Sequence, residues 1–145
     1  MSIRPLIVLG ALVGAGCGDF EIVVPGTLSA VIAPAHGSVE VSRDVEIFVA
    51  FSDPVSDADQ ALDDIVLQCL GAPPCQTPTA STCTAEFPVA AGAFVDSNQT
   101  ARLTPDSRLQ ANTCFVVTVQ AGIESSDQDV GPVPTALRSS FQTAP

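Results

Sequence analysis

Residues 45–52, Val45-Glu46-Ile47-Phe48-Val49-Ala50-Phe51-Ser52, decide the fold class of this chain. The apolar side chains at positions 45, 47, 49 and 51 recur with a period of two, so a β-strand places them on one face. A helix would scatter the same four side chains around its axis. The β-branched residues also favour a strand. The stretch therefore predicts a strand with one buried face, ended by Asp53-Pro54.

Short strand-like segments separated by turn residues continue this pattern along residues 29–145. We expect further strands at 31–33, 39–41, 65–69, 101–104, 112–120 and 137–143, with 87–89 and 93–95 as additional candidates. Residues 58–62 fit one helical turn, and no crossover helix of convincing length or Gly-rich phosphate loop is visible. About seven or eight strands with turns at this spacing are typical of a β-sandwich. The sequence therefore predicts an all-β fold in one domain.

Three groups of motifs lie in a fixed order along the same residues. They are Val31…Pro34-Ala35-His36-Gly37…Val45-Glu46-Ile47-Phe48-Val49-Ala50-Phe51-Ser52-Asp53-Pro54-Val55, then Leu103-Thr104-Pro105…Leu109…Asn112-Thr113-Cys114-Phe115-Val116-Val117-Thr118-Val119, and finally Phe141-Gln142-Thr143. This order resembles the bacterial Ig-like domain of the S-layer (SbsA) type. The resemblance implies an Ig-like, Greek-key β-sandwich over residues 29–145 and a non-enzymatic surface module, often a spacer or adhesion unit. The chain departs from the family pattern at Phe115, where Tyr is usual, in the insertion at 75–83, and at 124–129 in place of a short turn.

The N-terminus has the features of an export signal. Arg4 precedes the apolar run 6–16, which ends in small residues and is too short to cross a bilayer as a helix. A cysteine directly after Gly14-Ala15-Gly16 resembles the lipobox of bacterial lipoprotein signals, although Gly14 stands where Leu, Val or Ile is usual. The resemblance implies a signal peptide at 1–16, an acylated Cys17 as the first mature residue, and a linker at 17–28. The alternative is a buried N-terminal strand or helix.

The cysteine count agrees with a lipid-anchored protein. Of the 5 cysteines, acylation of Cys17 leaves Cys69, Cys75, Cys83 and Cys114 to form disulfides, as expected of an exported protein. A zinc site is disfavoured because no two of them have Cys-x-x-Cys spacing. In an Ig-type sandwich, the strand ending at Cys69 would lie antiparallel to the strand beginning near residue 112. We therefore favour a Cys69–Cys114 pair with Cys75–Cys83; the alternative is Cys69–Cys75 with Cys83–Cys114.

The charge of the chain limits its partners. A net charge of −11 repels nucleic acid and anionic headgroups, so we expect no nucleic-acid partner. Membrane attachment would then come from lipid on Cys17, and we expect the other partner to be another envelope or surface protein. Gly18 rather than Asp follows Cys17, which favours the outer over the inner membrane of the bacterial envelope.

The sequence offers little catalytic machinery. His36 is the one histidine, and it lies in a Pro/Gly turn. No Gly-x-Ser-x-Gly motif is present, and the cysteines are expected in lipid or disulfide linkages. We therefore expect a protein that is not an enzyme and needs no cofactor.

Two further ligand classes have some support in the sequence, Ca²⁺ and glycans. Acidic residues crowd the loop at 53–64, and Ca²⁺ takes six to eight oxygen ligands from such loops; these residues are Asp53, Asp57, Asp59, Asp63 and Asp64. Asp127 and Asp129 form a second, smaller group. The spacing does not match an EF-hand, and a solvated acidic loop is the alternative. Glycan binding is weaker still, because the chain has no Trp or Tyr to stack on sugars.

Phe48 is the aromatic residue to suspect at an interface, because it lies on the opposite face of its strand from Val45, Ile47 and Val49. The leading hypothesis is therefore a lipid-anchored envelope lipoprotein with an Ig-like structural or protein-interaction domain. A lipoprotein that binds Ca²⁺ or a small ligand through residues 53–64 is the alternative, and a glycan-binding adhesion module is the third.

Overall fold

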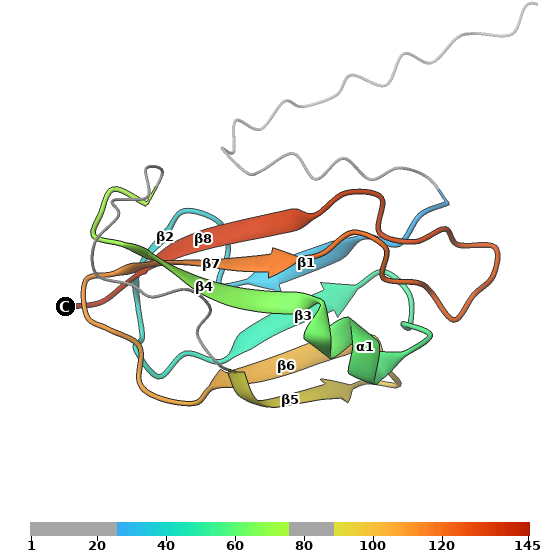
Figure 1. Cartoon of the computed structure of the whole chain (residues 1–145), viewed down its shortest axis with the longest axis horizontal. Coiled ribbons are helices and arrows are strands. Elements are labelled where there is room, and N and C mark those ends of the chain that lie inside the picture. Colours follow the sequence, from blue (N-terminus) through green and yellow to red (C-terminus); the bar gives the residue numbers. More distant parts are fainter. Residues whose placement is uncertain (1–25, 76–88) are drawn as a thin grey trace, which may run out of the picture.

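Two four-stranded sheets packed face to face form the body of the protein (Figure 1). The computed structural model describes residues 26–75 and 89–145. The first sheet has the order β1 (Ala30–Ala33), β3 (Ile47–Phe51), β6 (Thr100–Pro105), β5 (Val89–Val95). The second has the order β2 (Ser38–Val41), β8 (Leu137–Thr143), β7 (Cys114–Val119), β4 (Ile65–Gly71). The predicted all-β sandwich is confirmed.

The strand order is that of an immunoglobulin constant-type sandwich. Strands β1, β3, β6 and β5 correspond to the A-B-E-D sheet, and β4, β7 and β8 to the C-F-G sheet. Neighbouring strands run antiparallel except for β2, an additional strand that pairs with β8 in parallel. The chain crosses repeatedly between the sheets, so each sheet collects strands from distant parts of the sequence.

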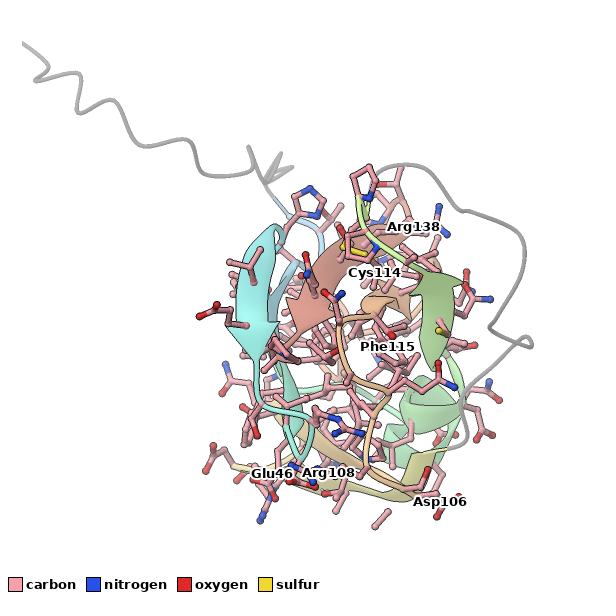
Figure 2. All side chains as sticks on the ribbon, turned by 90° about the vertical axis from the view of Figure 1, so that its left-hand side faces the viewer. Glu46, Asp106, Arg108, Cys114, Phe115 and Arg138 are labelled. Carbon is pink, nitrogen blue, oxygen red and sulfur yellow. A yellow bond between two sulfur atoms is a disulfide. The ribbon has the colours of Figure 1, made fainter. Side chains whose placement is uncertain are left out.

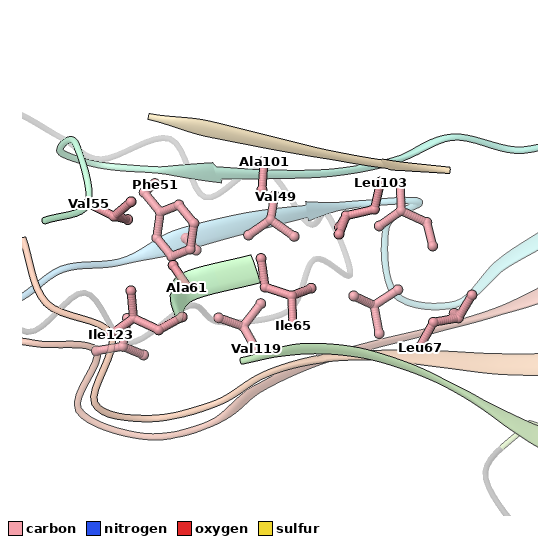
Figure 3. Close-up of a cluster of buried hydrophobic side chains, with 14 of the residues drawn as sticks. Val49, Phe51, Val55, Ala61, Ile65, Leu67, Ala101, Leu103, Val119 and Ile123 are labelled. Atoms are coloured by element: carbon pink, nitrogen blue, oxygen red, sulfur yellow. The ribbon is translucent and has the colours of Figure 1, made fainter. Parts of the chain in front are cut away.

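The core fills the space between the sheets. Most of its side chains come from the alternate, inward-facing positions of the strands, and α1 (Ala58–Asp63) and the loops add others, such as Ala61, Val55 and Ile123, as Figure 3 shows for one part of it. In β3, Ile47, Val49 and Phe51 are buried whereas Phe48 and Ala50 are exposed. The alternation predicted for residues 45–52 is therefore confirmed. The strand itself begins two residues later than the apolar pattern, because residue 45 closes a turn by donating its backbone N–H to the carbonyl of Ser42.

Strand β5 differs from the prediction. We expected two short strands, at 87–89 and 93–95, but residues 89–95 form one strand that pairs with β6. The small residues Ala90, Ala91 and Gly92 have low intrinsic strand preference. The neighbouring strand β6 supplies the backbone hydrogen bonds that hold them extended. Tertiary pairing, not local sequence, decides this element.

A single short helix, α1 (Ala58–Asp63), lies among the described residues and follows β3. Its one turn was predicted at 58–62. Asp57 caps its N-terminus by accepting a hydrogen bond from the backbone N–H of Gln60, at 3.0 Å. Ala61 is buried against the core.

No helix in residues 26–75 or 89–145 is long and apolar enough to span a membrane. The predicted signal peptide at 1–16, Cys17 and most of the linker at 17–28 lie outside the described residues. The same is true of Cys83 and of the first part of the strand expected at 87–89.

Candidate functional site

The outer face of the β1-β3-β6-β5 sheet is the first candidate surface. Strand register places Ala33, Phe48, Arg102 and Ala93 in one row across the four strands. A second row consists of Val31, Ala50, Thr100 and Val95. Because side chains at alternate positions share a face, all eight point away from the core. We call these eight residues the open face.

The open face is apolar and accessible to solvent. The three largest exposed apolar side chains on it are Val31, Phe48 and Val95, with exposed fractions of 62%, 36% and 40%. The predicted outward orientation of Phe48 is therefore what the structure shows. Sequence reasoning missed Val31 and Val95. Their alternation within their own strands was visible, but only the register between strands shows that they share the outer face of one sheet with Phe48.

One ion pair involves the open face, because Arg102 is one of its eight residues. Arg102 donates hydrogen bonds from Nε and Nη2 to Oε1 of Glu46, and the Nε–Oε1 distance is 3.0 Å. The hydrogen bond to Glu46, and its negative charge, raise the pKa of Arg102. The pair cancels the charge of Arg102, so the face as a whole stays nearly uncharged.

The outer face of the second sheet is different, because β7, one of its two middle strands, is covered. All six residues of β7 are buried, including the outward-facing Cys114, Val116 and Thr118. Cys114 forms a disulfide with Cys75, with Cα atoms 5.2 Å apart. Residues 72–75, which directly follow β4, therefore lie over one end of this face. Figure 2 shows Cys114 and Arg138 on the side of the molecule opposite Glu46.

The disulfide corrects both pairings expected from the sequence. Strands β4 and β7 do lie antiparallel, as predicted, but Cys69 lies opposite Phe115, and Cys114 lies opposite Gly71. Adjacent residues of a strand point to opposite faces, so Cys69 points with Phe115 towards the core and Cys114 points outward. Two cysteines on opposite faces of a sheet cannot bond. The favoured Cys69–Cys114 pair is therefore wrong. The other predicted pairs are wrong too, because each uses Cys75 or Cys114, which are bonded to each other; these pairs are Cys75–Cys83, Cys69–Cys75 and Cys83–Cys114.

The acidic residues expected to bind Ca²⁺ are spread along the segment around α1. Asp57 caps the helix, Asp53 accepts a hydrogen bond from the Ser52 hydroxyl at 2.8 Å, and Asp64 follows the helix at its C-cap. Asp59 and Asp63 lie on the exposed side of α1. No group of three or more His, Cys, Asp or Glu side chains within residues 26–75 and 89–145 is arranged to hold a metal. The Ca²⁺ hypothesis stays a prediction, without support from this geometry.

The second acidic group and the histidine have structural roles. Asp127 accepts a hydrogen bond from the backbone N–H of Asp129 at 3.0 Å, which closes a local turn. The Nδ1 atom of His36 accepts from the backbone N–H of Ser140 at 3.2 Å and lies 3.1 Å from the Ser140 hydroxyl. The imidazole thus attaches the β1–β2 turn to β8.

The Phe141-Gln142-Thr143 motif has a clear structural reason. The ring of Phe141 stacks on Phe115 in the core, with centroids 5.8 Å apart. The fully buried Thr143 hydroxyl donates to the carbonyl of Gln110 at 2.6 Å and accepts from the backbone N–H of Thr113 at 3.0 Å. It therefore holds the loop before β7 against the last strand. Phe115 fills the core without needing the hydrogen-bond partner that a Tyr would require.

Comparison with solved structures shows the fold. The N-terminal part of the bacterial S-layer protein SbsC is 15% identical, with a TM-score of 0.52 over 81% of this chain and 24% of that chain. A structure of SbsC domains 1–6 is 14% identical, with a TM-score of 0.51 over 81% and 14%. An L,D-transpeptidase from Mycobacterium smegmatis is 20% identical over 83% and 41%, but its TM-score of 0.47 is too low to carry an argument. The chain thus spans less than half of each of these proteins.

A search of curated proteins gave no match. A family model described as "Bacterial Ig-like domain" matches residues 25–143, nearly the whole of the region expected from the sequence motifs. The strand order and this match agree with each other and with the resemblance drawn from the sequence: the chain belongs to the bacterial Ig-like domain family.

Proposed function

We propose that this protein is a non-enzymatic, lipid-anchored module of the bacterial envelope that binds another envelope protein through the open face. The observation that carries the proposal is the exposure of Val31, Phe48 and Val95 on the outer face of one sheet. Large apolar side chains that are exposed together on one face mark interaction sites.

The charge distribution supports a protein as the partner. The chain carries a net charge of −11, yet the open face holds one charged residue, Arg102, neutralised by Glu46. An uncharged apolar surface on an acidic body suits the centre of a protein interface, where charged residues are depleted. A phosphate backbone or an anionic headgroup would gain nothing there.

The disulfides support the anchor. Cys75 and Cys114 are bonded to each other, and Cys69 is also in a disulfide. Of the 5 cysteines, this leaves Cys17 and Cys83: one of them is the disulfide partner of Cys69, and the other is free to carry the lipid. We assign Cys83 to Cys69, because the lipobox-like sequence before Cys17 favours acylation there. Export through such a signal would place the domain in an oxidising compartment, where disulfides persist.

Mass spectrometry of the protein isolated from the envelope of a bacterial host tests the anchor. We expect a mature chain that begins at Cys17 and carries fatty acyl chains, and a Cys17→Ala variant that lacks them. Digestion without reduction should give one peptide pair joining Cys75 to Cys114 and another joining Cys69 to Cys83. A chain that keeps residues 1–16 and no lipid would contradict the anchor. Membrane fractionation of the same cells tests the preference for the outer membrane.

Site-specific photo-crosslinking tests the open face. A photoreactive residue at position 31 or 95 should crosslink to one envelope protein, and Phe48→Asp in the same chain should abolish that crosslink. Val39 provides a matched control, since it is 66% exposed but lies on β2 outside the open face. Crosslinking that is equal from position 39, or that survives Phe48→Asp, would contradict the proposed interface.

A further inference from the structure

A polar depression lies on the outer face of the other sheet. Its volume is about 360 Å³, within the size range of small-ligand sites. It is lined by Val66, Gln68, Thr118, Gln120, Ala136 and Arg138.

The strand register explains why these six residues meet. Thr118 of β7 lies opposite Val66 of β4 on one side and opposite Arg138 of β8 on the other. Gln68 lies two residues after Val66 and Gln120 two residues after Thr118, so both share the outer face with them. Residues from three strands therefore converge on the depression, with Thr118 at its centre.

Thr118 is the observation that points to a ligand. Its side chain is 7% exposed, and its Oγ1 atom is buried without a hydrogen-bond partner among the described residues. Buried hydroxyl groups nearly always have a partner, because burial without one costs free energy. The contrast with Thr143, whose equally buried hydroxyl both donates and accepts, shows what a structural threonine looks like in this fold.

Arg138 determines the charge of the site. The other arginines of the described residues are engaged: Arg102 with Glu46, Arg108 with Asp44, and Arg43 with the carbonyl of Leu109. No ion pair within 26–75 or 89–145 involves Arg138. The lining holds no carboxylate either, although acidic residues outnumber basic ones by 16 to 5 in the whole chain.

We propose that this depression is a binding site for a small organic carboxylate. The Arg138 guanidinium would hold the carboxylate as a charge-assisted pair, and the Thr118 hydroxyl would donate to one of its oxygens. The amides of Gln68 and Gln120 supply further donors, and Val66 and Ala136 contact the apolar part of the ligand. One cation matches one negative charge, so the site favours a carboxylate over a phosphate dianion, which the acidic protein would repel more strongly. The site is independent of the open face.

Calorimetric titration of the purified full-length protein tests this proposal. The probes are N-acetylalanine, as a peptide-type carboxylate, and glucuronate, as a sugar-type carboxylate. Each is paired with a neutral analogue, N-acetylalaninamide and glucose. We expect at least one of the two carboxylates to bind and its neutral analogue not to bind. Which carboxylate binds indicates whether the ligand is peptide-like or sugar-like. Binding of neither carboxylate, equal binding of a neutral analogue, or tighter binding of inorganic phosphate would overturn the proposal.

Variants assign the site to these residues. Thr118→Val removes the hydroxyl while keeping the shape, and we expect about tenfold weaker binding with no loss of thermal stability. Arg138→Gln should weaken binding about tenfold or more, and Arg138→Lys should restore part of it. Arg108→Gln is the matched control, because Arg108 is an exposed arginine outside the depression, and it should bind as the wild type does. Unchanged binding in both Thr118→Val and Arg138→Gln would place the ligand elsewhere.

Discussion

The two outer faces of this sandwich differ although the two sheets have the same number of strands. On the β1-β3-β6-β5 sheet, the two middle strands expose Phe48, Ala50 and Arg102 to solvent. On the β2-β8-β7-β4 sheet, β7, one of the two middle strands, is buried on both faces, whereas β8 exposes Arg138. The difference comes from what lies over each sheet. The Cys75–Cys114 disulfide attaches a segment to the second sheet, and long side chains such as Gln68 and Arg138 flank its centre. A face left open suits a macromolecular partner, whereas a partly covered face with a polar depression suits a small ligand.

The largest expected effect comes from placing one charge on each face. Val116→Asp should lower the free energy of unfolding by about 3–5 kcal/mol, because Val116 is 4% exposed and its new charge would be buried without a partner. Phe48→Asp should lower it by less than about 1 kcal/mol, since a surface substitution is well tolerated. Urea denaturation of both variants measures the difference. Equal destabilisation would show that the two faces are covered to the same degree.

The disulfide gives the next largest effect. Replacing Cys75 and Cys114 together by Ser should cost about 2–4 kcal/mol, mainly because the unfolded chain loses a constraint. If this bond holds the covering segment on the second sheet, the double variant should also weaken carboxylate binding while leaving crosslinking from the open face unchanged. A stability loss without any difference between the two faces would argue that the bond does not shape either surface. The melting curve and both binding assays on the same preparation provide the measurement.

A comparison of two buried threonines sharpens the contrast between structural and functional polar groups. Thr143→Val should cost about 1–3 kcal/mol, because the buried backbone N–H of Thr113 and carbonyl of Gln110 lose their partner. Thr118→Val should be neutral or slightly stabilising, because its hydroxyl has no hydrogen bond to lose within the described residues. Thermal denaturation of the two variants side by side decides this. A matching loss in Thr118→Val would mean that its hydroxyl already has a structural partner.

The smallest effect is expected at the Glu46–Arg102 pair. Both side chains are exposed to solvent, so Glu46→Gln should leave the melting temperature unchanged within error. The same variant removes the charge that raises the pKa of Arg102, and it leaves the open face with an unpaired cation. We therefore expect weaker crosslinking to the partner without a loss of stability. Unchanged crosslinking would show that neutrality of the open face is not needed for binding.

Much of the fold could be predicted because it follows from local sequence patterns, such as apolar alternation and turn residues. The alternation at 45–52 identified the inward and outward faces of β3, including the exposed Phe48. The single turn of α1 and the positions of β1, β2, β4, β6, β7 and β8 followed from apolar periodicity and turn residues, with small errors at their ends. Strand β5 was missed as one element because its centre, Ala90-Ala91-Gly92, has little strand preference of its own. Its hydrogen bonds to β6 are a non-local property.

The site was harder to predict than the fold. The predicted Cys69–Cys114 pair was wrong by one residue of register. Strands β4 and β7 do lie side by side as predicted, but Cys69 and Cys114 project from opposite faces of the sheet. The depression around Thr118 was not found, since its residues are separated by up to 72 positions in the chain (138 − 66) and none of them belongs to a recognisable motif.

The sequence by itself determined which side chains β3 turns inward, the bacterial Ig-like class of the domain, and the acidic character of the chain. Only the tertiary structure decided which outward side chains become neighbours, and therefore where the open face, the Cys75–Cys114 bond and the polar depression lie. The physical reason is that alternation within a strand is a local consequence of backbone geometry. Register between strands depends instead on how the whole core packs, and a shift of one residue exchanges the two faces.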